Sequence, residues 1–158
     1  MNPVASVSVL TRALLLAAFV VAPATGAIAG DFFEVDGIAL RGYDPVAYFS
    51  DKAPVQGSQQ FKADYRGSTF HFRSQANREA FIADPAKFAP QYGGYCAFGA
   101  AGGYKAATQP AAFTVVDGKL YLNYNRDVQK KWSTDIPGYV QSADRKWPEV
   151  SAQTKVIP

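Results

Sequence analysis

Soft metal ligands and nucleophiles are scarce in this sequence, whose 158 residues include one cysteine and one histidine. A single thiol cannot form a disulfide within the chain, and it cannot supply a structural zinc site of the cysteine-rich kind. Net charge is also small, at +3, and the lysines and arginines form no block. Binding of nucleic acid through charge alone is therefore not expected.

Two common functional patterns are missing as well. The Asp and Glu residues show no paired spacing typical of a metal loop, and no glycine-rich loop leads into a Lys-Ser or Lys-Thr pair. Most carboxylates instead fall where helix caps and turns are expected. The sequence thus predicts neither a phosphate cradle nor a carboxylate metal loop.

The first 29 residues have the pattern of a Sec-type signal peptide. Arg12 is the only charge before Asp31, and it precedes an apolar run over residues 13–22. That run is shorter than the ~20 residues that span a bilayer, and Ala27 and Ala29 form an A-x-A cleavage signal. We expect a periplasmic or secreted protein beginning at Gly30, with no membrane span after cleavage. An uncleaved anchor is the alternative.

The remaining chain is predicted to be one domain over residues 30–150, followed by a polar tail over residues 151–158. Asp44 and Pro45 favour a helix start, Ser74 a second, and Asp84 with Pro85 a third. Alternating residues predict strands over 60–65 and 69–73.

The second half begins with the clearest hairpin of the chain, two apolar strands around Asp117-Gly118. Asn125 is expected to cap a helix over 126–133, and Pro137 and Pro148 are expected to bracket the last helix. Strands and helices that do not alternate as βαβ indicate a small α+β domain, with antiparallel hairpins and short helices packed on them.

Cys96 is the principal candidate for chemistry, because it lies between glycines and tyrosines in a segment we expect to be a loop. The thiol could be a metal ligand, a redox centre, an interchain disulfide partner or a buried small side chain. His71 is the natural nitrogen partner for a soft metal, although strand alternation predicts that it points outward. Tyr95, next to Cys96, completes the set of ligand or metal candidates.

Several of these motifs, taken in order, resemble the YHS domain over residues 42–90. The resemblance rests on Asp44-Pro45-Val46, the strand ending at Phe72, Ser74, Phe81 and Asp84-Pro85-Ala86-Lys87-Phe88. The stretch with Gly93, Gly94 and Cys96 is similar to a secreted, single-domain branch of that family. The resemblance implies a small α+β module associated with metal handling, and some members of the branch carry selenocysteine at the position that matches Cys96.

The thiols that metal-type YHS modules carry are missing from this chain. Ala47 stands where a cysteine follows Asp-Pro-Val, and Arg73-Ser74-Gln75-Ala76-Asn77 stands in place of Cys-Ser-x-x-Cys. Metal binding therefore does not follow from the family, and any metal site would need Cys96.

Three hypotheses for function follow. The preferred one is a non-catalytic binding module for an unidentified protein or small ligand, with no required cofactor and with Cys96 as its one reactive feature. The first alternative is a binder of copper or another soft metal through Cys96. The second is a thiol redox protein in which Cys96 is oxidised and reduced.

Overall fold

The structure is a computed structural model, and it describes residues 31–158. The proposed signal peptide and its cleavage site lie outside these residues. The N-terminal half is built on a four-stranded sheet of order β1-β2-β4-β3. Its strands are β1 (Glu34–Val35), β2 (Ile38–Ala39), β3 (Ser58–Tyr65) and β4 (Ser68–Phe72). Strands β3 and β4 form the predicted antiparallel hairpin, and β2 runs parallel to β4.

Three short helices accompany this sheet, namely α1 (Ala47–Ser50), α2 (Gln75–Ala83) and α3 (Pro85–Phe88). Their predicted starts are confirmed. The Asp44 carboxylate accepts hydrogen bonds from Val46 N and from Ala47 N, the first residue of α1. The Ser74 hydroxyl accepts from Asn77 N, and the Asp84 carboxylate accepts from Lys87 N. Each side chain thereby satisfies donors that a helix cannot pair internally.

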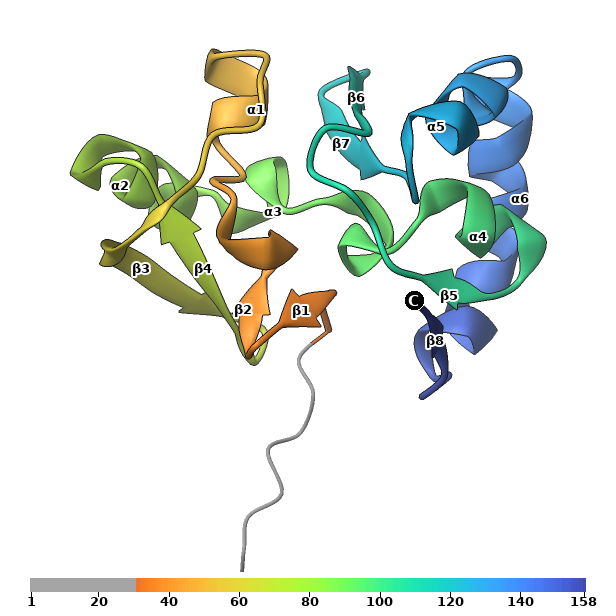
Figure 1. The fold of residues 1–158 in the computed structure, drawn as a ribbon, viewed down its shortest axis with the longest axis horizontal. Coiled ribbons are helices and arrows are strands. Elements are labelled where there is room, and N and C mark those ends of the chain that lie inside the picture. The colour runs from red at the N-terminus through yellow and green to blue at the C-terminus, as the bar shows by residue number, and fades with distance from the viewer. Residues whose placement is uncertain (1–30) are drawn as a thin grey trace, which may run out of the picture.

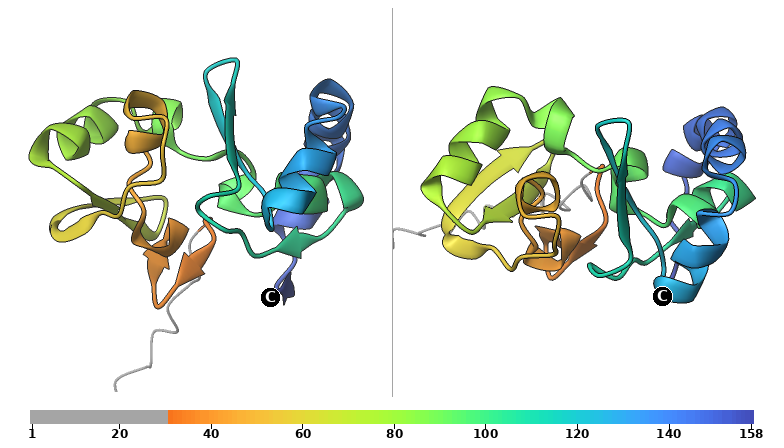
Figure 2. Two further views of the ribbon diagram at one scale, coloured as in Figure 1. Left: turned by 45° about the horizontal axis from the view of Figure 1, so that its top comes forward. Right: turned by 90° about the horizontal axis from the view of Figure 1, so that it is seen from above.

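The hairpin of β6 (Phe113–Val116) and β7 (Lys119–Leu122) lies between the two halves of the molecule (Figures 1 and 2). Successive side chains of a strand point to opposite faces. Leu120 and Leu122 accordingly join the core of the N-terminal half, whereas Tyr121 joins the core beneath the C-terminal helices. One strand therefore connects the two cores.

The C-terminal half contains α4 (Ala97–Gly102), α5 (Arg126–Trp132) and α6 (Ile136–Ser151). Two expectations differ from the structure here. Helix α6 does not end at Pro148 but continues through it to Ser151, with Val150 buried in the last turn. The proline removes one hydrogen bond of the helix, and this loss does not end it. The expected tail is docked, since β8 (Val156–Ile157) pairs with β5 (Lys105–Ala106).

Aromatic side chains dominate the interior. Phe70, Phe72 and Phe81 are almost completely buried and pack ring against ring in the N-terminal core. Trp132 occupies the centre of the second core, in contact with Tyr121. This packing explains most of the high aromatic content, as expected for a small domain with few leucines and isoleucines.

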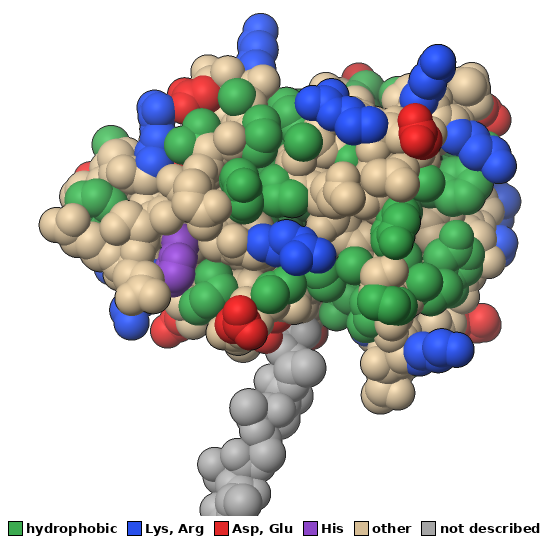
Figure 3. All heavy atoms as spheres, in the orientation of Figure 1, with side chains coloured by type: hydrophobic (Ala, Val, Ile, Leu, Met, Phe, Trp, Pro, Cys, Tyr) green, Lys and Arg blue, Asp and Glu red, His purple; other side chains and the backbone are tan. Residues whose placement is uncertain are grey.

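The fold class is the predicted one, a small α+β domain with antiparallel hairpins and short helices. Among residues 31–158, no helix has both the length and the apolar character needed to cross a bilayer. On the face shown in Figure 3, the lysines and arginines are dispersed and do not form a basic patch.

Candidate functional site

Cys96 begins a helix, and the expectation that it lies in a loop is wrong. The residue is the N-cap of α4, and its sulfur accepts hydrogen bonds from Gly99 N at 3.4 Å and Tyr124 N at 3.3 Å. Only 2% of the residue is exposed. A cysteine is an unusual N-cap, and the expectation failed because serine, threonine, aspartate and asparagine are the usual signals for a helix start.

The surroundings of the sulfur favour a neutral thiol. The thiol donates to Asn123 Oδ1 at 3.7 Å, and that oxygen also accepts from Phe98 N. Burial raises the pKa of the Cys96 thiol, an effect that the backbone hydrogen bonds to the sulfur oppose. The groups closest to the sulfur are thus N–H donors, whereas a metal ion needs several lone pairs directed at one point.

His71 is buried, and the expectation that it points outward is wrong. It is 7% exposed on β4, under the segment that contains Gly42 and Gly57. A Cβ atom at Gly57 would lie 2.6–2.7 Å from the His71 backbone and Cβ, so this close cover requires glycine. Burial lowers the pKa of His71, and the nearby Lys62 ammonium lowers it further.

His71 and Cys96 are not brought together. Strand β4 and helix α4 lie on opposite sides of the hairpin (Figure 1), and the imidazole is visible near one end of the molecule (Figure 3, purple). In the part of the chain that the structure describes, no three His, Cys, Asp or Glu side chains are grouped so that they could hold a metal ion.

Tyr95 and the two glycines before it lead to a different site. Tyr92, Gly93 and Gly94 all adopt positive φ in the 3₁₀ turn η2 (Gln91–Gly94). A Cβ atom at Gly93 would lie 2.2 Å from the Asp31 carbonyl oxygen, which confirms that glycine permits close approach here. This turn places the rings of Tyr92 and Tyr95 at the wall of a cavity.

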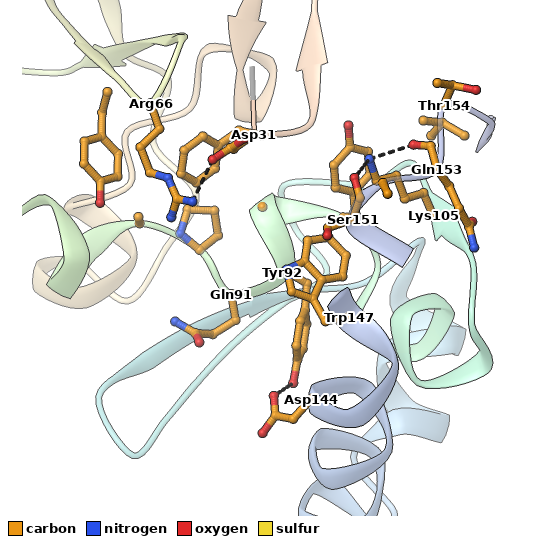
Figure 4. Close-up of a pocket in the computed structure, with 18 of the residues that line it drawn as sticks. Asp31, Arg66, Gln91, Tyr92, Lys105, Asp144, Trp147, Ser151, Gln153 and Thr154 are labelled. Carbon is orange, nitrogen blue, oxygen red and sulfur yellow. Dashed lines mark hydrogen bonds and ion pairs between the residues drawn. The ribbon is translucent and has the colours of Figure 1, made fainter. Parts of the chain in front are cut away.

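The cavity has a volume of about 830 Å³ and lies between the two halves of the molecule (Figure 4). The N-terminal half contributes Asp31 and Arg66. Turn η2 contributes Gln91 and Tyr92, and the C-terminal half contributes the following residues: Lys105, Asp144, Trp147, Ser151, Gln153 and Thr154. The volume is within the range of small-molecule sites.

Aromatic rings form one wall of this cavity. The Trp147 ring lies 5.5 Å from the Tyr92 ring in an edge-on arrangement and 6.3 Å from the Tyr95 ring, centre to centre. Tyr92 and Tyr95 are buried, whereas Trp147 remains partly exposed. The two tyrosines thus fix the indole ring of Trp147 in place.

Each charged group that lines the cavity has a partner within the protein. Arg66 pairs with Asp31 at 2.7 Å, and the Tyr92 hydroxyl donates to the Asp144 carboxylate at 2.8 Å. Burial and the bond to Asp144 raise the pKa of Tyr92, so this hydroxyl stays protonated. The Lys105 ammonium donates to the Ser151 and Gln153 carbonyls at the end of α6.

Of the sequence candidates, only Tyr95 lines this cavity, together with Gly93 from the resemblance motif. Arg66, Lys105 and Gln153 come from distant parts of the chain, and nothing in their local sequence connects them. The sequence of α6 did contain a usable pattern. Asp144, Trp147 and Ser151 follow the spacing i, i+3, i+7, which places them on one face of a helix.

The comparisons with known proteins support the resemblance. A family model described as the YHS domain matches residues 46–92, which include α1, the β3–β4 hairpin, α2, α3 and the start of η2. This chain is therefore a YHS domain-containing protein. Comparisons with curated proteins and with solved structures gave no match.

Proposed function

We propose that this chain is an exported, non-catalytic binding protein whose ligand occupies the cavity between the YHS domain and the C-terminal helices. The observation that carries the proposal is the cavity itself, with its fixed aromatic wall and the polar side chains that line it. Pockets that combine aromatic surface with a few convergent polar groups are typical of small-ligand sites. The heavy-metal association of YHS domains is not needed for this proposal.

The location of the site supports a role for the C-terminal half. The YHS match ends at Tyr92, and the cavity is completed by residues that follow it, from Gly93 to Val156. The added segment thus supplies about half of the residues that line the cavity, including Trp147. In this proposal the YHS domain provides the scaffold, and the additional helices provide the binding surface.

Ligand binding can be tested by filling the cavity. Ala86 lies on α3 at the cavity wall and is exposed, so Ala86→Trp should obstruct the cavity without disturbing the core. We expect a library of small polar and aromatic compounds, screened by NMR, to yield binders that shift signals of cavity residues. Ala86→Trp should abolish these shifts.

The matched control is Ala83→Trp, which places the same bulky ring at an exposed position near the end of α2 that does not line the cavity. This variant should bind as the unmodified protein does. Absence of any binder at the cavity, or equal binding by both tryptophan variants, would contradict the proposed function.

Export is tested separately. When the full chain is expressed in a bacterium with a Sec system, we expect the protein outside the cytoplasm with an intact mass that begins at Gly30. The Ala29→Arg variant should remain unprocessed, because the cleavage site requires small residues. Recovery of the unprocessed chain from the cytoplasm in both cases would refute export.

A further inference from the structure

The charges around the cavity indicate what kind of ligand it takes. Its lining contains two carboxylates, Asp31 and Asp144, and two cations, Arg66 and Lys105. Four internal interactions already engage all four groups: the Arg66–Asp31 ion pair, the Tyr92–Asp144 hydrogen bond and the two bonds from Lys105 to carbonyls. Because the wall carries two groups of each sign, it favours neither a cationic nor an anionic ligand.

Hydrogen-bonding capacity nevertheless remains. The ammonium of Lys105 has three N–H groups, of which two are used, and the Asp144 carboxylate has a second oxygen. The Gln91 amide and the Thr154 hydroxyl line the same space. The wall therefore offers both donors and acceptors without a net charge, which suits a ligand rich in hydroxyl groups.

The indole of Trp147 supplies an apolar platform beside these polar groups (Figure 4). The ring is held by Tyr92 and Tyr95 and remains partly exposed. A flat aromatic face packs well against a saturated ring that has C–H groups on one face and polar groups around its edge. Pyranose rings have this combination of an apolar face and a polar edge.

We infer that the cavity takes a neutral, polyhydroxylated ring compound of the saccharide class, with one ring lying on Trp147. This inference rests on the proposed function, because it names the ligand class of the same cavity. A volume of about 830 Å³ accommodates more than one sugar ring. Gln91, Asp144 and Lys105 are then the groups that bond to hydroxyls along the ring edge.

The test uses three disaccharides, one neutral, one cationic and one anionic. The probes are N,N′-diacetylchitobiose, which is neutral, its deacetylated glucosamine dimer, which is cationic, and digalacturonate, which is anionic. The full chain, in the form recovered after expression with its own N-terminal segment, is titrated with each at millimolar concentration and followed by the indole N–H signals and by tryptophan fluorescence. We expect the neutral dimer to bind and the charged dimers to bind at least about tenfold more weakly.

Variants of Trp147 test whether binding depends on its indole ring. Trp147→Ala should weaken binding of the neutral dimer at least about tenfold, and Trp147→Phe should retain part of it, because an aromatic face remains. Since Trp147 also packs against two tyrosines, the thermal midpoint of each variant must show that it is folded. Tyr124→Ala removes a partly exposed ring outside the cavity and should leave binding unchanged.

The outcomes separate this inference from the proposed function. Preferential binding of a charged dimer at the cavity overturns the neutral-saccharide inference and leaves the proposed function standing. The same holds if no dimer binds but other small compounds shift the cavity signals and Ala86→Trp abolishes these shifts. If neither the dimers nor any other compound reaches the cavity, both are refuted.

Discussion

Replacement of Asp44 by alanine is expected to lower the free energy of unfolding by about 3–5 kcal/mol. The Asp44 side chain is fully buried, and its two oxygens accept four hydrogen bonds. Oδ1 accepts from Val46 N and Ala47 N at the start of α1, and Oδ2 accepts from Arg73 N and Asn77 Nδ2. Alanine would leave all four donors buried or half-buried without a partner.

Urea denaturation of the purified protein provides the measurement, through the midpoint and slope of the unfolding curve. Asp44→Asn keeps the shape of the side chain but turns one acceptor into a donor that faces other donors. It should therefore lower the free energy of unfolding by roughly half as much as Asp44→Ala does. This second variant keeps the prediction testable if Asp44→Ala does not fold.

The matched control is Asp84→Ala. Asp84 also precedes a proline and also caps a helix, but it is exposed and its side chain accepts one hydrogen bond, from Lys87 N. Asp84→Ala should lower the free energy of unfolding by about 1 kcal/mol or less. If Asp44→Ala and Asp84→Ala lowered the free energy of unfolding equally, Asp44 would act only as a helix cap. That result would contradict the view that Asp44 links α1, β4 and α2.

This pair of aspartates shows how far sequence reasoning reaches in this protein. Local patterns predicted both caps, and likewise the β6–β7 hairpin and the fold class, because caps, turns and alternation are decided by neighbouring residues. The same patterns made the two Asp-Pro pairs look equivalent. The contacts of Asp44 with Arg73 and Asn77 depend on residues about thirty positions away, and no local signal reports them.

The candidate site was less accessible to sequence reasoning for a similar reason. The outward position expected for His71 assumed that the second face of β4 is exposed, whereas the segment around Gly57 covers it. The cavity draws its walls from residues 31 to 156. Only Tyr95 was singled out as a candidate, and that choice depended on its position beside Cys96.

The thiol of Cys96 should be nearly inert while the protein is folded. We expect its reaction with a thiol reagent such as iodoacetamide at neutral pH to be at least about 100-fold slower in the native protein than in urea. Two causes act together, because the residue is 2% exposed and burial raises the thiol pKa, which reduces the thiolate fraction at neutral pH. The rate should stay low as the pH is raised to the ordinary thiol pKa of about 8.5, where a free cysteine already reacts readily.

The reference for this experiment is a surface thiol in the same fold. Ala83→Cys in a Cys96→Ser background places the only thiol at an exposed position on α2, and it should react at similar rates in the presence and absence of urea. Serine keeps an oxygen that can accept from Gly99 N and Tyr124 N, so the helix start should be preserved. Fast alkylation of native Cys96 would mean that its sulfur is accessible and activated, and it would favour the thiol redox hypothesis over a binding protein in which Cys96 holds the start of α4.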